Sequence, residues 1–189
     1  MLLNENLNFE TLPSHIKGSF NGLIAKHQAI DTGTYLYKFT DWELFNVRTD
    51  KDGNTSTSVS PFWGTIGDLN DVLAYAISTK KTLLDCVRAR NAVLHNWNGL
   101  TSLIVIQTTQ KVYGFTGNIG PQTEKGYAKE GQSYSRHFTA PLAFWGGASQ
   151  VYLPNLNPSY IREIVPPNTV SIHDKEVRTI QELVRDYIV

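Results

Sequence analysis

Hydrophobic and polar residues follow two different periods along the chain, and each period predicts a different kind of element. Residues 35–39 alternate with a period of two, which places Lys38 on the strand face opposite three aromatic side chains. Apolar residues recur at helical spacing over residues 68–77, with Asp68 as the expected N-cap, and again over about 82–97. The first half of the chain is therefore expected to hold a strand followed by two helices.

The second half consists mainly of predicted strands. The uninterrupted apolar run at 102–107 is typical of a strand covered on both faces, and residues 111–115 are expected to pair with it. Further strands are predicted at 142–145, 150–153, 160–165 and 169–172. A closing helix is expected over residues 174–189, with Asp174 as its N-cap.

Because helices are expected mainly in the first half of the chain and strands mainly in the second, the pattern predicts an α+β fold rather than a repeating strand–helix–strand sheet. No repeat or linker divides the chain, so residues 1–189 are expected to form a single domain. Residues 1–32 are predicted to be an irregular or partly helical lead-in. The long polar stretch at 117–137 is expected to be a functional or mobile loop.

Composition and charge narrow the classes of function. The 17 basic residues are balanced by 17 acidic ones, so the chain lacks the basic field of nucleic-acid binders, and a nucleic-acid partner is not expected. One cysteine and five scattered histidines give no metal-ligand spacing, and no metal is expected. The N-terminus does not read as a signal peptide and no apolar run is long enough to span a membrane, which predicts a soluble protein.

Four segments carry candidate chemistry, in a chain that lacks the common glycine-rich phosphate-binding and hydrolase signatures. They are the strand with Lys38, the Ser/Thr-rich residues 55–60, the glycine-containing residues 115–122, and residues 145–154, which begin Trp-Gly-Gly-Ala-Ser-Gln. Each segment alone is typical of an ordinary strand or turn. Their order and spacing together suggest one site.

At these segments the chain resembles the ADP-ribosyltransferase-like superfamily, whose members present a cation on an early strand, a Ser/Thr-rich strand, and a late strand headed by Glu or Gln. The Gly-Asn-Ile-Gly-Pro sequence at 117–121 and the Gly-Gly-x-x-Gln that ends at Gln150 are similar to NAD glycohydrolases of the tuberculosis-necrotizing-toxin type. The resemblance covers about residues 35–165 and implies a split, bent mixed sheet with flanking helices. The chain departs from the family in having Lys38 where Arg is usual and Gln150 where Glu is usual.

The resemblance implies a role for each candidate residue. Gln150 and Lys38 would be catalytic, with the Gln150 amide oxygen stabilising the oxocarbenium-like transition state of nicotinamide–ribose cleavage. Lys38, or Arg48 as its rival, would hold the pyrophosphate. Ser58 would hydrogen-bond the nicotinamide amide or the ribose. The nicotinamide ring would stack on one of three aromatic side chains, namely Phe62, Trp63 and Trp145.

The resemblance also implies that NAD+ is a substrate, cleaved by glycohydrolysis or by mono-ADP-ribosylation. It further implies a toxin or effector that acts in the cytosol after delivery without a signal peptide, with a protein acceptor or a cognate immunity protein as partner. Two alternatives stay open: a non-catalytic protein-binding module, and a degenerate transferase fold that only binds nucleotide. A binding module has no reason to bring Lys38, Ser58 and Gln150 into one cleft.

Overall fold

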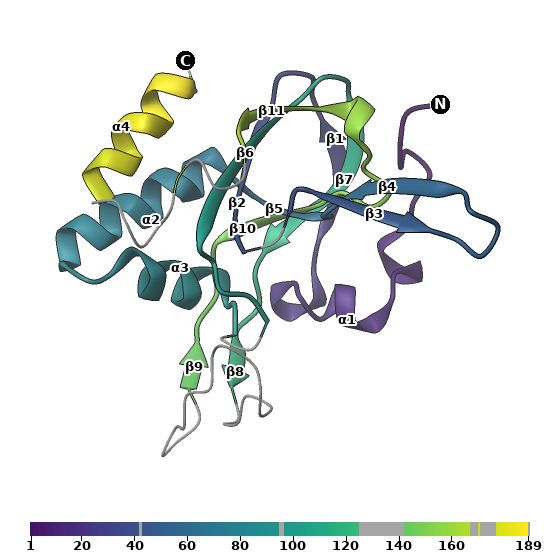
Figure 1. The fold of residues 1–189 in the computed structure, drawn as a ribbon. Helices are drawn as coiled ribbons and strands as arrows, with labels where there is room; N and C mark the ends of the chain where they lie inside the picture. Colours follow the sequence, from purple (N-terminus) through teal and green to yellow (C-terminus); the bar gives the residue numbers. More distant parts are fainter. Residues whose placement is uncertain (42, 95–96, 125–141, 167–169, 171–176, 189) are drawn as a thin grey trace.

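The computed structural model describes residues 1–41, 43–94, 97–124, 142–166, 170 and 177–188. In these residues a seven-stranded sheet has the strand order β1-β7-β10-β5-β2-β6-β11 (Figure 1). Its strands are β1 (Lys26–Ile30), β2 (Tyr35–Thr40), β5 (Phe62–Thr65), β6 (Ser102–Thr108), β7 (Val112–Asn118), β10 (Ser149–Tyr152) and β11 (Ile161–Val165). Two hairpins lie outside this sheet, formed by β3 (Phe45–Thr49) with β4 (Thr55–Val59) and by β8 (Gln122–Glu124) with β9 (Leu142–Phe144).

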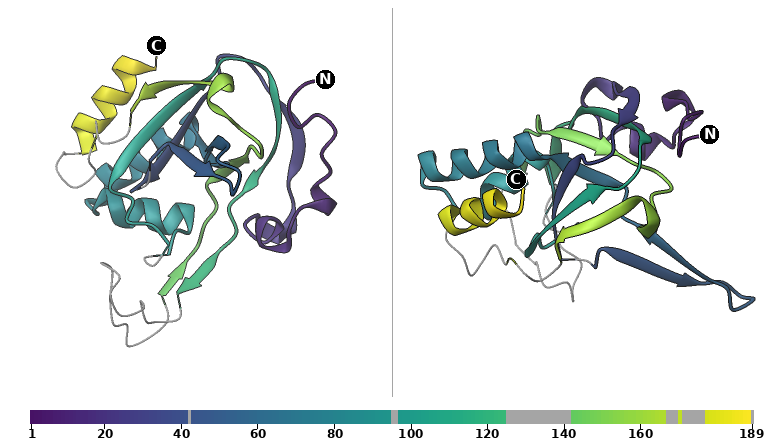
Figure 2. Two further views of the ribbon diagram at one scale, coloured as in Figure 1. Left: turned by 45° about the vertical axis from the view of Figure 1, so that its right-hand side comes forward. Right: turned by 90° about the horizontal axis from the view of Figure 1, so that it is seen from above.

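Helices α2, α3 and α4 pack against one face of the sheet. The helices of the described residues are α1 (Ser14–Lys17), α2 (Ile66–Thr79), α3 (Leu83–Asn91) and α4 (Val177–Tyr187), with short 3-10 turns at Phe9–Thr11, Asn21–Leu23 and Pro158–Tyr160. Helices α2, α3 and α4 lie together, whereas α1 lies near β1 and β7 at the other end of the sheet, which is strongly curved (Figures 1 and 2). The α+β class and the bent sheet that the sequence predicts are confirmed.

The alternation of β2 sets the two faces of the core. Tyr37 and Phe39 pack with the three helices, whereas Leu36 packs in a second cluster on the opposite face. In β6, Val105 belongs to the first cluster and Ile106 to the second, and both are fully buried. The prediction that the apolar run forms a strand covered on both faces is therefore confirmed.

Both expected helices of the first half form, but their ends differ from the prediction. Asp68 is not the N-cap of α2: Thr65 takes that position, and its Oγ1 accepts from the Asp68 amide while donating to the Asp68 carboxylate at 2.6 Å. Both contacts run through the Thr65 hydroxyl, which satisfies one of the free amides in the first turn, and the acid lies three residues inside the helix. The second helix ends at Asn91 rather than near 97, because Ala92 turns the backbone into the left-handed region at φ 47°.

Strand pairing also corrects three expectations. Of the expected strand at 111–115, residues 112–115 form part of β7, which pairs with β1 and β10 and not with β6. The lead-in up to residue 32 contains a true edge strand, β1. The sheet is not mixed: each of its strand pairs is antiparallel, and within the described residues a parallel arrangement occurs only at the isolated bridge between Leu3 and Val112.

Several predictions about the second half fall partly outside the described residues. The Asp174 cap lies there, as does the part of the 117–137 stretch after residue 124. Of the expected strand at 169–172 only residue 170 is described, and it lies in a bend. Before that point the stretch is ordered as the end of β7 and as β8. The closing helix is confirmed as α4, which buries Ile180 and Val184 as its apolar spacing predicts.

Candidate functional site

A cavity of about 590 Å³ lies where the main sheet splits. Strands β2 and β5 separate after the pair formed by Tyr37 and Gly64, and β2 then continues along β6 while β5 pairs with β10. A smaller cavity of about 100 Å³ shares Lys38 and Gln150 with the larger one. We treat the two as one site and call it the split-sheet pocket.

The walls of the split-sheet pocket come from segments far apart in the sequence. They are the N-terminal segment around α1, strands β2, β5 and β10, the end of α3 with the loop that follows it, and the β7–β8 connection. Aromatic and aliphatic side chains, among them Phe39, Phe62 and Leu100, form much of the surface, and a few polar groups converge on it. A concave site of this size, largely apolar with few polar groups, is typical of small-molecule binding.

Gln150 lies at the base of this pocket and is only 7% exposed. In the sheet it stands between two glycines, Gly64 of β5 and Gly117 of β7. Close packing requires both glycines: a Cβ on Gly64 would lie 2.3 Å from the Tyr37 ring, and one on Gly117 would lie 2.7 Å from a backbone carbonyl oxygen. The Gln150 Nε2 donates to Ser19 Oγ at 2.8 Å.

The other end of the Gln150 amide is open. Within the described part of the chain, Oε1 accepts no hydrogen bond. It is also not among the side-chain atoms that are both fully enclosed and without a partner, so part of its surface is accessible. A ligand in the pocket can therefore reach this oxygen, which acts only as an acceptor.

Lys38 brings a positive charge into the same pocket. Its Nζ donates to Ser60 Oγ and lies 6.0 Å from the centroid of the Trp63 ring. No carboxylate among the described residues forms an ion pair with it. Burial lowers the pKa of Lys38 to about 8, so most molecules carry this ammonium at neutral pH without a counter-charge from the part of the chain that the structure describes. An anionic ligand would supply that counter-charge.

Two of the expected site residues lie elsewhere. Arg48 and Ser58 belong to the β3–β4 hairpin, an arm that projects from the body of the molecule, and both are exposed (Figure 1). The expected convergence of Lys38, Ser58 and Gln150 is thus correct for Lys38 and Gln150 and wrong for Ser58. Ser60, which follows the arm, takes the place next to Lys38.

The arm supplies matched controls for any test of the pocket. Arg48→Ala and Ser58→Ala remove exposed side chains outside it, so each is expected to change the free energy of unfolding by less than about 0.5 kcal/mol. Ligand binding in the split-sheet pocket should stay at the wild-type level. Urea denaturation and calorimetric titration check both expectations, and a large loss of binding in Arg48→Ala would return that residue to the site.

The three aromatic side chains that were candidates for stacking also differ in where they lie relative to the pocket. Phe62 lines the pocket, whereas Trp63 is 3% exposed, touches only the smaller cavity, and donates its indole N–H to the Ser60 carbonyl oxygen at 2.7 Å. Trp145 is 56% exposed and does not line the pocket. Trp97 does line the pocket and is 50% exposed, so it provides a second aromatic surface. Helical spacing predicts this residue at the end of the helix over about 82–97.

Asn91 is a further pocket residue that the sequence did not indicate. It ends α3, and its Nδ2 donates to the Tyr37 hydroxyl at 3.3 Å. Burial raises the pKa of Tyr37 to about 12, so that phenol stays neutral at physiological pH. The loop beyond Asn91 is tied to α3 by the buried Arg88, which donates to the carbonyl oxygens of Val93 and Leu94.

The glycine turn before β10 sets the position of Gln150. Gly146 and Gly147 both have positive φ, at 70° and 88°, and a Cβ on Gly146 would lie 2.5 Å from the Ile119 carbonyl oxygen. The amide of Gly146 donates to Ala89 of α3 at 3.0 Å, and that of Gly147 donates to Ile119 at 2.9 Å. The turn thereby links α3 to the end of β7 and fixes the register in which β10 enters the sheet.

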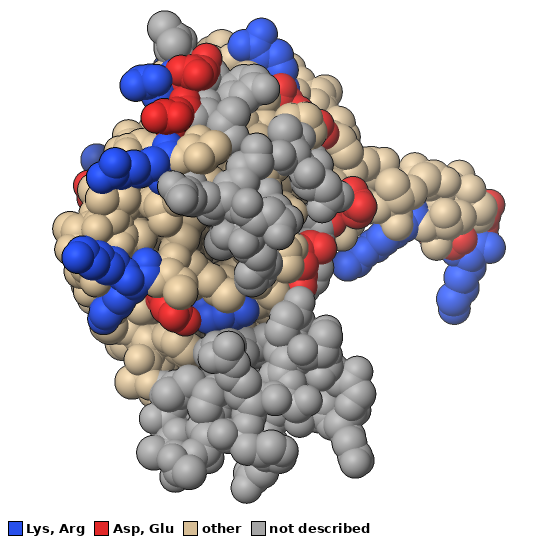
Figure 3. Space-filling model, turned by 60° about the vertical axis from the view of Figure 1, so that its left-hand side comes forward, with Lys and Arg blue, Asp and Glu red and all other residues tan. Residues whose placement is uncertain are grey.

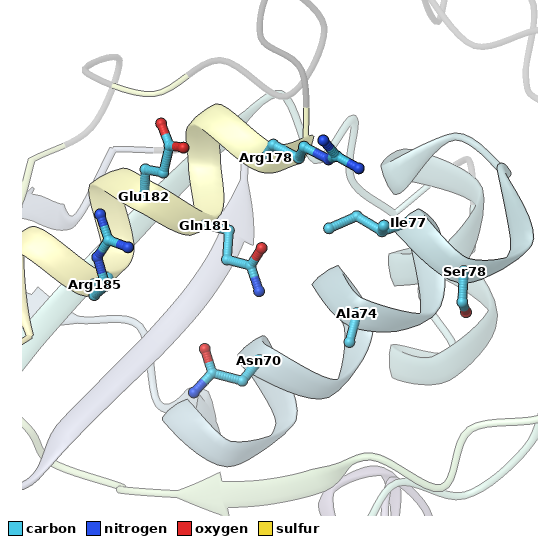
Figure 4. A pocket seen from close by; sticks show the side chains of 8 residues that line it. All are labelled: Asn70, Ala74, Ile77, Ser78, Arg178, Gln181, Glu182 and Arg185. Atoms are coloured by element: carbon cyan, nitrogen blue, oxygen red, sulfur yellow. The ribbon is translucent and has the colours of Figure 1, made fainter.

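A second cavity, of about 710 Å³, is an open groove between α2 and α4 (Figure 4). Asn70 and Gln181 point into the space between the helices, and Arg178, Glu182 and Arg185 line the α4 side. These side chains are exposed, and acidic and basic groups are interspersed on this face of the molecule (Figure 3). The groove therefore has the character of a solvated boundary between two helices.

Comparisons with known proteins do not identify the chain. No protein-family model matches it, and no curated protein matches it. One similar solved structure is "Rhs1-CT in complex with cognate immunity protein RhsI1", with 11% sequence identity, a TM-score of 0.41, and coverage of 76% of this chain and 79% of that one. A likeness at this level carries no argument about fold or function.

No group of three or more His, Cys, Asp or Glu side chains among the described residues lies close enough together to hold a metal ion. Within the same residues, no helix combines the length and the apolar character needed to cross a membrane.

Proposed function

We propose that the split-sheet pocket binds NAD+ and cleaves its nicotinamide–ribose bond. One observation carries the proposal: the Lys38 ammonium, which forms no ion pair with the described residues, and the open amide oxygen of Gln150 line the same pocket. These are the two residues to which the resemblance with ADP-ribosyltransferase-like enzymes assigns catalysis. A protein-binding module would have no need for a partly buried cation and an acceptor oxygen in one cavity.

The pocket offers groups for the pyrophosphate, the nicotinamide ring and the adjoining ribose of the substrate. The Lys38 ammonium suits the negative pyrophosphate, with which it would form a charge-assisted hydrogen bond. Phe62 offers an aromatic wall on which the nicotinamide ring can stack, and Trp97 offers a second stacking surface at an exposed position. Gln150 would lie beside the ribose.

In the proposed reaction the bond between nicotinamide N1 and ribose C1′ breaks, and both bonding electrons leave with nicotinamide, which becomes neutral. The positive charge that develops on C1′ and the ring oxygen would be stabilised by the dipole of the Gln150 carbonyl. Water then attacks C1′ and releases a proton to solvent, which gives ADP-ribose and free nicotinamide. We favour hydrolysis over transfer because a neutral amide cannot act as the base that deprotonates a protein acceptor.

The test is to incubate the purified protein with NAD+ and to quantify nicotinamide and ADP-ribose by chromatography, with and without a cell extract as a source of acceptor proteins. We expect equal amounts of nicotinamide and free ADP-ribose, and the same activity in Arg48→Ala. ADP-ribose attached to protein would instead indicate transfer. Calorimetric binding of NAD+ without nicotinamide release would indicate a nucleotide-binding fold that does not cleave, and absence of binding would refute the site.

The proposal extends to a toxin or effector that acts in the cytosol, with a cognate immunity protein as partner. Both follow from the resemblance to toxin-type NAD glycohydrolases. Cleavage of the cellular NAD+ pool would stop growth, so production of the chain in a bacterial cytosol should lower NAD+ and arrest division. The same experiment with Gln150→Ala should leave NAD+ and growth unaffected.

A further inference from the structure

A chain of hydrogen bonds connects Gln150 to the N-terminal segment. Ser19 Oγ donates its proton to the Ile16 carbonyl oxygen at 2.7 Å and accepts from Gln150 Nε2 at 2.8 Å. Ser19 and Gln150 are 131 positions apart, and both line the split-sheet pocket. The contact therefore joins the region around α1 directly to the candidate catalytic residue.

The direction of these bonds fixes the orientation of the Gln150 amide. A hydroxyl has one proton, and in Ser19 it is used by the Ile16 carbonyl oxygen, which can only accept. The lone pairs of Ser19 Oγ must therefore meet a donor, which in a glutamine is Nε2 and not Oε1. With Nε2 held in this way, Oε1 is the end of the amide left for the ligand.

Ser19 is held in place by contacts that do not involve Gln150. Its backbone amide donates to Ile16 at 3.1 Å, and its carbonyl oxygen accepts from the Gly120 amide at 2.9 Å. The next residue, Phe20, is 2% exposed and packs in an aromatic cluster with Phe115. The backbone that carries the Ser19 hydroxyl is therefore held rigidly, as is required of a group that orients another side chain.

We infer that Ser19 is a positioning residue that fixes the rotamer and the amide orientation of Gln150, so that Oε1 faces the reacting ribose. This inference rests on the proposed function, since it assigns Ser19 a role in that same site. It also makes the segment around α1, through Ser19, part of the active site, although the sequence of that segment reads as a lead-in.

The kinetic test compares Ser19→Ala, Ser19→Thr and the double variant Ser19→Ala with Gln150→Ala. Loss of the hydroxyl should lower kcat for nicotinamide release by about ten- to a hundredfold with little change in KM, because small misplacements of a catalytic group have effects of this size. Ser19→Thr keeps a hydroxyl and should restore most of the rate. Ser19→Ala should have no further effect once Gln150 is alanine. The inference is overturned by a wild-type kcat in Ser19→Ala, or by an equal loss in both backgrounds.

A second measurement does not depend on turnover. The side-chain NH2 signals of Gln150, identified by their disappearance in Gln150→Ala, should exchange slowly with solvent in the wild-type protein and in Ser19→Thr, and rapidly in Ser19→Ala. Unchanged exchange in Ser19→Ala would overturn the positioning role whether or not the protein is active. Protected signals in a wild-type protein that releases no nicotinamide would contradict the proposed function alone.

Discussion

Replacing Gln150 with alanine is expected to lower the rate of nicotinamide release by at least about a hundredfold, the loss typical of removing one preorganised group that stabilises transition-state charge. The reason is geometric: Oε1 of Gln150 is an open acceptor that lies in the same pocket as the Lys38 ammonium. KM should change less than kcat, because the interaction strengthens as charge develops on the ribose. Stopped-time chromatographic assays over a range of NAD+ concentrations measure both constants.

Stability must be measured alongside activity, because Gln150 is buried and hydrogen-bonded to Ser19. Removal of that bond and of the buried side chain is expected to lower the free energy of unfolding by about 1–2 kcal/mol. Gln150→Glu is the conservative partner variant, since it keeps an acceptor oxygen, and it should retain more activity than Gln150→Ala. A folded Gln150→Ala protein with wild-type turnover would remove Gln150 from the mechanism.

The strands that form the base of the site could be predicted because their side-chain patterns are local. Alternation in β2 and the continuous apolar run of β6 follow from what each strand packs against on its two faces. Lys38 and Gln150 were likewise found from short segments that share features with a known superfamily. Which strands become neighbours was harder to predict: β7 lies beside β1 and β10, a choice fixed by contacts between distant segments.

The errors in the site have two physical origins. The Ser/Thr-rich residues 55–60 do form a strand over most of their length, but β4 pairs with β3 in a separate arm, so Ser58 and Arg48 never reach the pocket. Alternation predicts a strand and gives no information about which sheet it joins. Ser19 was missed because its contact with Gln150 spans most of the chain and follows no periodic signal.

The split between β2 and β5 explains how an antiparallel sheet can hold a charged site. In an unbroken sheet, Lys38 would project from a face covered by core residues such as Leu36, where a lone ammonium is costly. Separation of the strands after Tyr37 and Gly64 instead opens a cavity beside Lys38. The position of the split thus determines where a cation can be kept partly desolvated and still meet a ligand.

Replacing Lys38 with methionine is expected to weaken NAD+ binding by about ten- to a hundredfold, because a charge-assisted hydrogen bond contributes roughly 1.5–3 kcal/mol. Methionine has a similar length and no charge, so the shape of the pocket should be kept. Calorimetric titration measures the dissociation constant, with Arg48→Ala as the control that removes an exposed cation. Equal affinities in the wild type and in Lys38→Met would mean that the phosphate-binding cation lies elsewhere.

The pH dependence of stability and of binding provides a separate signature of Lys38. Burial lowers its pKa from 10.5 to about 8, so between these two values the unfolded state binds more protons than the folded state. The free energy of unfolding of the wild-type protein should therefore rise with pH across that window relative to Lys38→Met, in which this contribution is absent.

The affinity for NAD+ should change in the opposite direction, weakening above pH 8 as the Lys38 ammonium loses its proton. The Lys38→Arg variant should keep its affinity over the same range, because a guanidinium stays charged. Parallel stability curves for the wild type and Lys38→Met, together with pH-independent binding, would show that Lys38 is neither desolvated nor in contact with the ligand.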